Sequence, residues 1–111
     1  MPATSAITPE TAAVIVHPNN PDGRLHPAPD AAFRVIDESF CDVTPDASHI
    51  ARATRPGTLI LKSFGKFWGL AGLRLGFAIA APETLNPPGR PGLADLLGPW
   101  PVSGPALARG A

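Results

Sequence analysis

Lys66 is the residue whose neighbours point most directly to chemistry. It lies in the segment Ser63-Phe64-Gly65-Lys66, and a glycine-rich turn follows it and leads to Arg74. A lysine amine forms a Schiff base with an aldehyde cofactor when a tight turn holds it within reach. Ser63 is able to bind a phosphate oxygen, and Arg74 to form a bidentate pair with the same phosphate. Because these features occur together, the pattern favours a cofactor site over a solvated surface lysine.

Two further polar residues stand at the ends of apolar runs. Asp37 follows Arg34-Val35-Ile36, so we expect it at the end of a buried strand, where a carboxylate needs a partner. A protonated pyridine nitrogen is one suitable partner, but an aspartate in an ordinary turn or helix cap explains the pattern equally well. Asn20 lies in Asn19-Asn20-Pro21-Asp22-Gly23, which plain turn chemistry explains fully. A role for the Asn20 amide as a donor to a ring oxygen depends on the other motifs.

Four apolar runs predict the strands that would position these residues. They are rich in β-branched and aliphatic side chains and cover Thr11–His17, Ala32–Asp37, Thr58–Ser63 and Arg74–Ala80. Each of the first three carries polar residues at its carboxyl end, which is the edge of an open α/β sheet where ligands bind. The expected fold class is therefore α/β.

The connections between these runs contain little helix. The stretch from Asn20 to Asp37 holds Pro21, Pro27 and Pro29 and has no helical periodicity. A bare loop of about 13 residues at roughly 3.3 Å each is long enough to return across a short strand, and it would leave that face of the sheet uncovered. Pro45–Ala53 predicts two helical turns and Gly92–Leu97 a shorter one.

Composition excludes several classes of function. The nine basic and nine acidic side chains give a net charge of zero, so neither nucleic acid nor a membrane surface is an expected partner. Cys41 is the only cysteine, which rules out an internal disulfide and favours a cytoplasmic location. The first ten residues lack a secretory signal pattern. His17, His26 and His49 do not have metal-ligand spacing with Cys41 or with one another, so no metal site is predicted.

Four segments together resemble a known family. They are HPNNPDGR (17–24), VIDESF (35–40), SFGKFWGLAGLRLGF (63–77) and LGPWPVSGPAL (97–107). This set resembles the fold-type I pyridoxal-phosphate enzymes of the aminotransferase class I/II superfamily. NNPDGR, DESF and the GPW-VSGPAL segment look most like the threonine-phosphate decarboxylase branch of cobalamin biosynthesis, a close relative of the histidinol-phosphate aminotransferases.

The resemblance implies a role for each candidate residue. Lys66 would form the internal aldimine with pyridoxal 5'-phosphate, Asp37 would pair with the pyridine nitrogen and Asn20 would bond the ring oxygen. Ser63 and Arg74 would bind the cofactor phosphate. In a decarboxylase of this kind the substrate, an amino-acid phosphate, displaces Lys66, carbon dioxide leaves, and a proton returns to the same carbon. In an aminotransferase Lys66 instead removes the α-proton.

The resemblance also implies how the chain is organised. Residues 1–85 would be part of a pyridoxal-phosphate-binding large domain, with a mostly parallel sheet, a final antiparallel strand and incomplete helical cover. Residues 86–111 would be a proline-rich tail that leads toward a small domain. The Asn20–Asp37 interval is shorter than in relatives. Phe40 replaces a common tyrosine, as in the decarboxylase branch.

Three interpretations follow from the resemblance. The first is a large-domain fragment of a decarboxylase that has no turnover alone, from a family whose intact members form homodimers. The second is a histidinol-phosphate or other class I/II aminotransferase. The third is a non-catalytic remnant or a chain that only binds.

Overall fold

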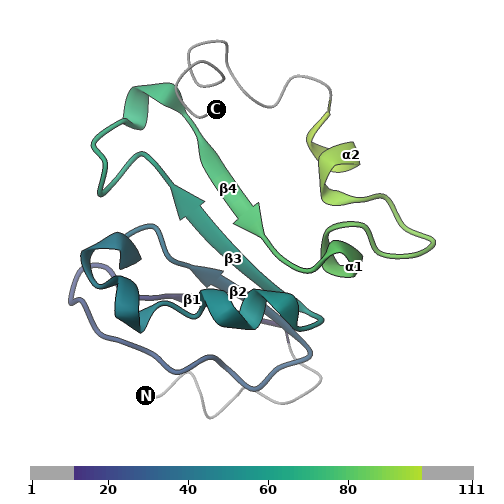
Figure 1. Ribbon diagram of the computed structural model, residues 1–111, viewed down its shortest axis with the longest axis horizontal. Helices are drawn as coiled ribbons and strands as arrows, with labels where there is room; N and C mark the ends of the chain where they lie inside the picture. The colour runs from purple at the N-terminus through teal and green to yellow at the C-terminus, as the bar shows by residue number, and fades with distance from the viewer. Residues whose placement is uncertain (1–11, 99–111) are drawn as a thin grey trace.

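The core of the protein is a four-stranded sheet with the strand order β1-β2-β3-β4 (Figure 1). The computed structural model describes residues 12–98. Strands β1 (Ala12–Val16), β2 (Phe33–Asp37) and β3 (Thr58–Ser63) are parallel, and β4 (Gly76–Ile79) pairs with β3 in the antiparallel direction. The predicted α/β class, with a mostly parallel sheet and a final antiparallel strand, is therefore confirmed. Each strand lies within a predicted apolar run.

The helices are all short. Those between β2 and β3 are 3-10 turns, and so is the one before β4: η2 (Cys41–Val43), η3 (Pro45–Ala47), η4 (Ile50–Thr54) and η5 (Ala71–Leu73). Two α-helical turns follow β4, α1 (Pro82–Leu85) and α2 (Leu93–Leu97). The predicted turn near residues 92–97 is thus confirmed, and the one over 45–53 forms as 3-10 helix. Within residues 12–98 no helix has the length and apolar character that crossing a membrane requires.

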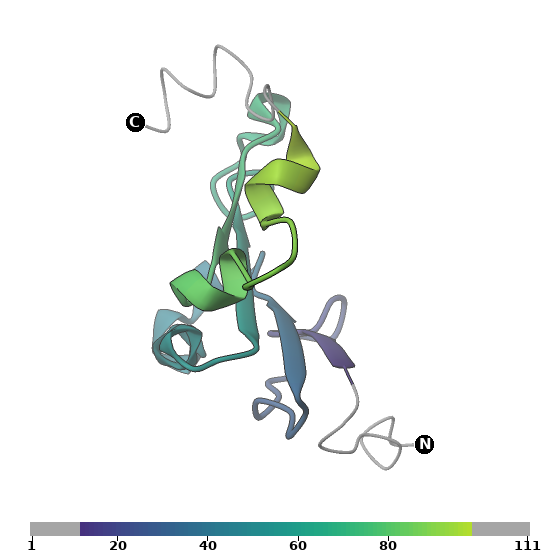
Figure 2. The same cartoon turned by 90° about the vertical axis from the view of Figure 1, so that its right-hand side faces the viewer.

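The register of the parallel strands places one isoleucine of each in a single row. Ile15 is the Cα partner of Ile36, and Ile36 is the Cα partner of Ile60. Because side chains alternate between the two faces of a sheet, this row lies on one face. Ile36 and Ile60 are fully buried there and form the core with Ala53 of η4. Figure 2 shows the 3-10 turns between β2 and β3 on that side of the sheet.

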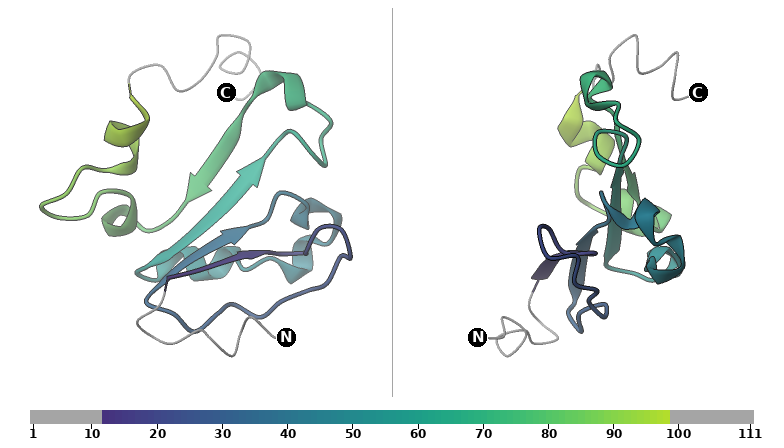
Figure 3. Two further views of the ribbon diagram at one scale, coloured as in Figure 1. Left: turned by 180° about the vertical axis from the view of Figure 1, so that it is seen from behind. Right: turned by 90° about the vertical axis from the view of Figure 1, so that its left-hand side faces the viewer.

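The loop between β1 and β2 covers more of the sheet than its sequence predicted. It is irregular, as expected, but Ala28 packs against the core cluster and Ala31 is buried. The loop and η4 therefore cover the same face. The opposite face is more open: Val14 is 71% exposed, and the view from behind shows no described helix across β1 (Figure 3). Phe33, at the other end of that face, lines a hollow with residues from α1 and α2.

Candidate active site

The carboxyl ends of β1, β2 and β3 meet at one edge of the sheet, as the sequence predicted. Val16 at the end of β1 is the Cα partner of Asp37, and Asp37 is in turn the Cα partner of Leu61. The turn that carries Asn20 follows β1, and Ser63 ends β3. Three of the five candidate residues therefore belong to a single edge because the strands that carry them are parallel.

Ser63, Lys66 and Arg74 line one cavity of about 280 Å³. Its remaining lining residues are Gly65, Ala71, Leu75 and Gly76. The cavity combines an amine, a hydroxyl and a guanidinium, the three groups that the motif was expected to bring together. No ion pair joins Lys66 or Arg74 to another residue within 12–98.

Backbone hydrogen bonds hold this cavity in shape. The Phe64 amide donates to the Leu75 carbonyl over 3.1 Å, which returns the chain beside the end of β3. The Leu70 amide donates to the Phe64 carbonyl over 2.9 Å. Gly76 begins β4, and a Cβ there would lie 3.0 Å from the Lys62 carbonyl oxygen. A side chain at this position would therefore press against the end of β3.

Arg74 occupies an unusual backbone conformation. Its φ of 54° lies in the left-handed region, where it ends η5 and its amide donates to the Ala71 carbonyl. A residue with a Cβ is strained there by about 1–2 kcal/mol. The strain is local to the loop that brings the guanidinium to the cavity beside Lys66.

Asp37 is half-buried and keeps one carboxylate oxygen accessible to a ligand. The Ser39 amide and the Ser39 hydroxyl both donate to Oδ1, over 3.0 Å and 2.6 Å. No hydrogen bond from residues 12–98 reaches Oδ2. This oxygen is therefore able to accept a hydrogen bond from a protonated ring nitrogen. Asp37 lines neither the Lys66 cavity nor the one that contains Asn20.

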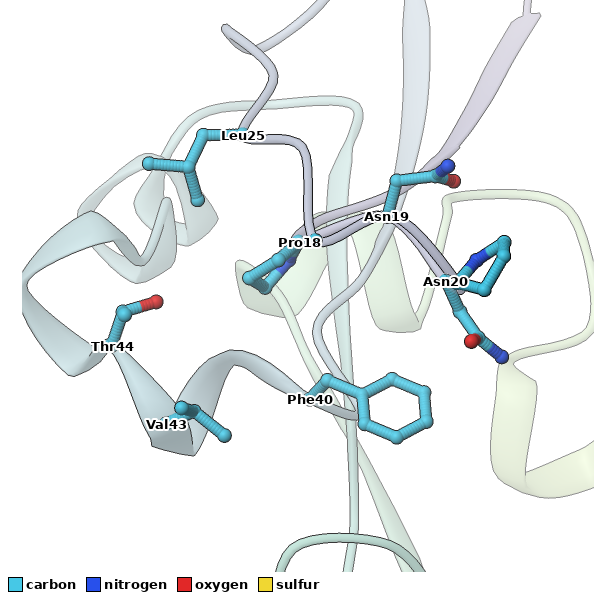
Figure 4. Close-up of a pocket in the computed structure, with 9 residues that line it drawn as sticks. Pro18, Asn19, Asn20, Leu25, Phe40, Val43 and Thr44 are labelled. Carbon is cyan, nitrogen blue, oxygen red and sulfur yellow. The ribbon is translucent and has the colours of Figure 1, made fainter.

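Asn20 faces a different hollow, of about 430 Å³. Figure 4 shows the Phe40 ring on the Asn20 side of this hollow and Val43 and Thr44 on the Leu25 side. Phe40 stands where many relatives were expected to have a tyrosine, so the wall beside the Asn20 amide is apolar here. The five candidate residues thus divide between two cavities and a strand end.

The turn around Asn20 is held by its neighbours rather than by Asn20 itself. Asp22 Oδ1 accepts hydrogen bonds from the Asn19 side-chain amide and the Arg24 backbone amide, each over 3.0 Å. The Arg24 amide, followed by the Asn19 side chain, lowers the pKa of Asp22 below its ordinary value. Asn19 and Asp22 therefore supply the side-chain hydrogen bonds of this turn.

A polar row that the sequence did not predict lies at this end of the sheet. It consists of His17, Glu38 and Lys62. Glu38 is fully buried, although Asp37 was the carboxylate expected to be so. It accepts hydrogen bonds from the Ser48 hydroxyl over 2.6 Å and the His49 amide over 2.7 Å, and it pairs with Lys62 Nζ over 3.0 Å. Burial acts to raise the pKa of Glu38, but these three partners together hold it below its ordinary value.

His17 belongs to the same row and is only 2% exposed. Its Nδ1 accepts a hydrogen bond from the His26 amide over 2.9 Å, and its Nε2 donates to the Ala47 carbonyl over 2.8 Å. Side-chain atoms of His17, Glu38 and Cys41 lie within 4.8 Å of one another, a grouping that the sequence spacing did not predict. Both ring nitrogens of His17 and both oxygens of Glu38 already have hydrogen-bond partners, so the row is a closed network.

The fold and the lysine cavity define a class of protein. The model of the aminotransferase class I and II family matches residues 4–106, and the chain belongs to this family. A histidinol-phosphate aminotransferase from Sinorhizobium meliloti, solved in complex with pyridoxal-5'-phosphate, has a TM-score of 0.55 and 28% identity. That match covers 66% of this chain and 23% of the other.

Two threonine-phosphate decarboxylases are more similar in sequence. The one from Pseudomonas aeruginosa is 45% identical over 103 residues, covering 83% of this chain and 30% of the relative. The one from a Sinorhizobium species is 47% identical over 106 residues, covering 85% and 30%. A histidinol-phosphate aminotransferase from Moorella thermoacetica is 38% identical. The chain thus spans about 30% of the length of these decarboxylases.

Proposed function

We propose that this chain is part of a pyridoxal-phosphate-dependent decarboxylase that acts on an amino-acid phosphate, of the threonine-phosphate decarboxylase kind. The observation that carries the proposal is the cavity in which Ser63, Lys66 and Arg74 meet. An amine for an aldehyde, and a hydroxyl and a guanidinium for a phosphate, are the donor set that a phosphorylated aldehyde requires. The identity with threonine-phosphate decarboxylases supports the choice of reaction.

Each candidate residue has a task that matches its surroundings. Lys66 would hold the aldehyde through its amine, which is exposed and within the cavity. Ser63 and Arg74 hold the phosphate. Asp37 Oδ2 would accept a hydrogen bond from the protonated ring nitrogen, and the Asn20 amide would donate to the ring oxygen. When bound, the cofactor ring accepts the electron pair of the bond that breaks at the substrate α-carbon.

Lys66 is the better placed of the two lysines for this task. Lys62 Nζ lies 3.0 Å from Glu38 Oε1 and 3.8 Å from Asp42 Oδ1, so its nitrogen is already engaged. Lys66 is exposed and lines the cavity. An aldehyde that enters the cavity therefore meets the Lys66 amine.

The test is to map the amine that reacts with the cofactor. The chain is mixed with an equal amount of pyridoxal phosphate, the visible absorbance is recorded, and borohydride reduction is followed by peptide mapping. We expect the label on Lys66 and its loss in Lys66→Arg. Arg90→Lys is the matched control, because it adds an exposed lysine outside the cavity and should remain unlabelled. Equal labelling of Lys66 and the residue-90 lysine would contradict the proposal.

An aminotransferase acting on histidinol phosphate is the second candidate, because a matching solved structure is described as a histidinol-phosphate aminotransferase. The two are distinguished by products: carbon dioxide from threonine phosphate, or amino transfer to a keto acid. We expect the chain alone to take up the cofactor without either turnover, since it spans about 30% of the matched decarboxylases. In a longer protein that contains this sequence we expect carbon dioxide release. Absence of both reactions there would favour a binding-only chain.

A further inference from the structure

The strand ladder continues one residue beyond the end of each of the first two strands. The His17 amide donates to the Asp37 carbonyl over 2.8 Å, and the Glu38 amide donates to the Leu61 carbonyl over 2.9 Å. Because Val16 is the partner of Asp37 and Asp37 that of Leu61, the next residues along form their own row across three strands. That row is His17, Glu38 and Lys62.

The row lies on the opposite face of the sheet from two of the candidate cofactor residues, Asp37 and Ser63. Glu38 follows Asp37 directly, and Lys62 directly precedes Ser63. Since successive side chains of a strand point to opposite faces, Glu38 and Lys62 share the covered face while Asp37 and Ser63 point away from it. The backbone of the sheet therefore lies between the side chains of Glu38 and Asp37, and between those of Lys62 and Ser63.

The row joins the strand ends to two segments that are distant in sequence. His17 bonds His26 in the loop between β1 and β2 and Ala47 in η3. Glu38 bonds Ser48 and the His49 amide, and the His49 ring reaches the His26 carbonyl over 2.6 Å. The bonds of His17 and Glu38 fix two strand ends against the covering layer, and the His49–His26 bond joins two segments of that layer. No member of the row lines the Lys66 cavity.

We propose that His17, Glu38 and Lys62 form a positioning row that holds Asn20, Asp37 and Ser63 in the geometry that the cofactor needs. This inference rests on the proposed cofactor site. Hydrogen bonds to charged and ring atoms are directional, so these bonds add to the backbone ladder in fixing where the strand ends lie. Small displacements of positioned groups are enough to weaken binding and catalysis strongly.

The direct test compares Glu38→Gln with Asp42→Asn. Both substitutions remove one negative charge beside Lys62, but Asp42 is the outer partner at 3.8 Å and lies outside the row. We expect the Kd for pyridoxal phosphate to rise roughly tenfold in Glu38→Gln. Asp42→Asn should stay within about twofold of the unchanged chain.

Two further readouts separate positioning from plain stability. The pH at which the visible absorbance of the lysine-bound cofactor fades should shift in Glu38→Gln, because the residues around Lys66 change position. Amide exchange of Ser39, whose N–H donates to Asp37 Oδ1, should accelerate while core amides of β3 keep their rates. If Glu38→Gln does not fold, Ser48→Ala removes one bond to Glu38 and should weaken binding about threefold.

A Glu38→Gln chain that melts at a lower temperature, but keeps its cofactor Kd and its Ser39 exchange rate, would overturn the positioning row. The Ser39 measurement needs no cofactor. If the unchanged chain fails to label at Lys66, the proposed function fails, yet accelerated Ser39 exchange in Glu38→Gln would still support the row. The two failures are therefore distinguishable.

Discussion

Acidic side chains at neighbouring positions have different environments in this protein. Asp37, at the carboxyl end of β2, has one oxygen bonded to Ser39 and no hydrogen bond to the other within residues 12–98, whereas Glu38 is fully buried and has three partners. Removing one partner of such a network leaves a buried charge without compensation, which is strongly destabilising. A residue that never touches the cofactor is therefore expected to affect stability more than one that does.

Glu38 should make the stability of the chain depend on pH. Its pKa is held below the ordinary value of 4.5, so its contribution is fully present above that pH and is lost as the pH falls through the lowered pKa. We expect the free energy of unfolding in urea to decline below pH 4.5, and Glu38→Gln to flatten that decline. Glu83→Gln, at an exposed position, is the control and should leave the pH dependence unchanged.

Arg74 should show a conflict between stability and binding. Its φ of 54° is unstrained for glycine, so Arg74→Gly should raise the free energy of unfolding by about 0.5–1 kcal/mol. The same change removes the guanidinium, and cofactor affinity should fall by roughly tenfold. Arg74→Ala should lose the affinity without the gain in stability. Equal stability of the two variants would show that the backbone strain is negligible.

Two turns at opposite ends of the strands, one before β3 and one after β1, differ in how tightly they pack. Gly57, just before β3, has a φ of +78°, and a Cβ there would overlap the Ala32 carbonyl oxygen. Gly23, in the Asn20 turn, has a similar φ of +71° with nothing within 4 Å of its Cβ position. Both resist substitution for conformational reasons, and only Gly57 resists it sterically.

Alanine substitutions at these glycines should separate the two effects. Gly23→Ala is expected to lower the free energy of unfolding by about 1 kcal/mol, the cost of a left-handed alanine. Gly57→Ala is expected to lower it by roughly 2–4 kcal/mol, because the backbone must also move away from Ala32. Urea denaturation measures both. Similar losses in the two variants would mean that the backbone at Ala32, just before β2, moves away from the added Cβ at little cost.

The strands were predictable because each is a short apolar run next to turn residues. Arg74 and Leu75 were included in the fourth run but lie outside β4, since the left-handed Arg74 ends η5 first. The lysine cavity was predictable from residue types and spacing. The buried row was not, because it depends on which residues become neighbours across three strands, and spacing along one strand carries no such information. Ile36 and Glu38 are two residues apart and therefore share one face of the sheet, which is the signal that could have indicated the row.

At the scale of the whole molecule, the core formed within residues 12–98 is small. Ile36, Ala53 and Ile60 form the buried cluster, and large apolar side chains such as Val14 and Trp68 are 71% and 56% exposed. Little apolar area is then available to offset the conformational entropy of folding. A ligand that binds only the folded chain should have a large relative effect on stability.

Pyridoxal phosphate is expected to stabilise the chain measurably. At 100 times its Kd a ligand adds about 2.7 kcal/mol, which corresponds to a rise in the melting temperature of roughly 10 °C for a domain of this size.

Cys41 offers a second measurement, because its thiol is fully buried and burial raises its pKa. Alkylation of Cys41 should slow in the presence of the cofactor, and Lys66→Arg should lose most of both effects. A melting temperature that does not change with cofactor concentration would contradict the expectation.

The single layer of backbone between the two faces has an evolutionary consequence. His17, Glu38 and Lys62 lie side by side at the ends of three strands, which backbone hydrogen bonds and an ion pair connect. A substitution at one of these positions therefore changes which residues fit at the other two. Among related sequences these three positions should covary as a set, while positions 37 and 63 should follow the cofactor and stay fixed. A lineage that no longer binds the cofactor would then be free to lose Asp37 and Ser63 first, and would keep the row for as long as it keeps the fold.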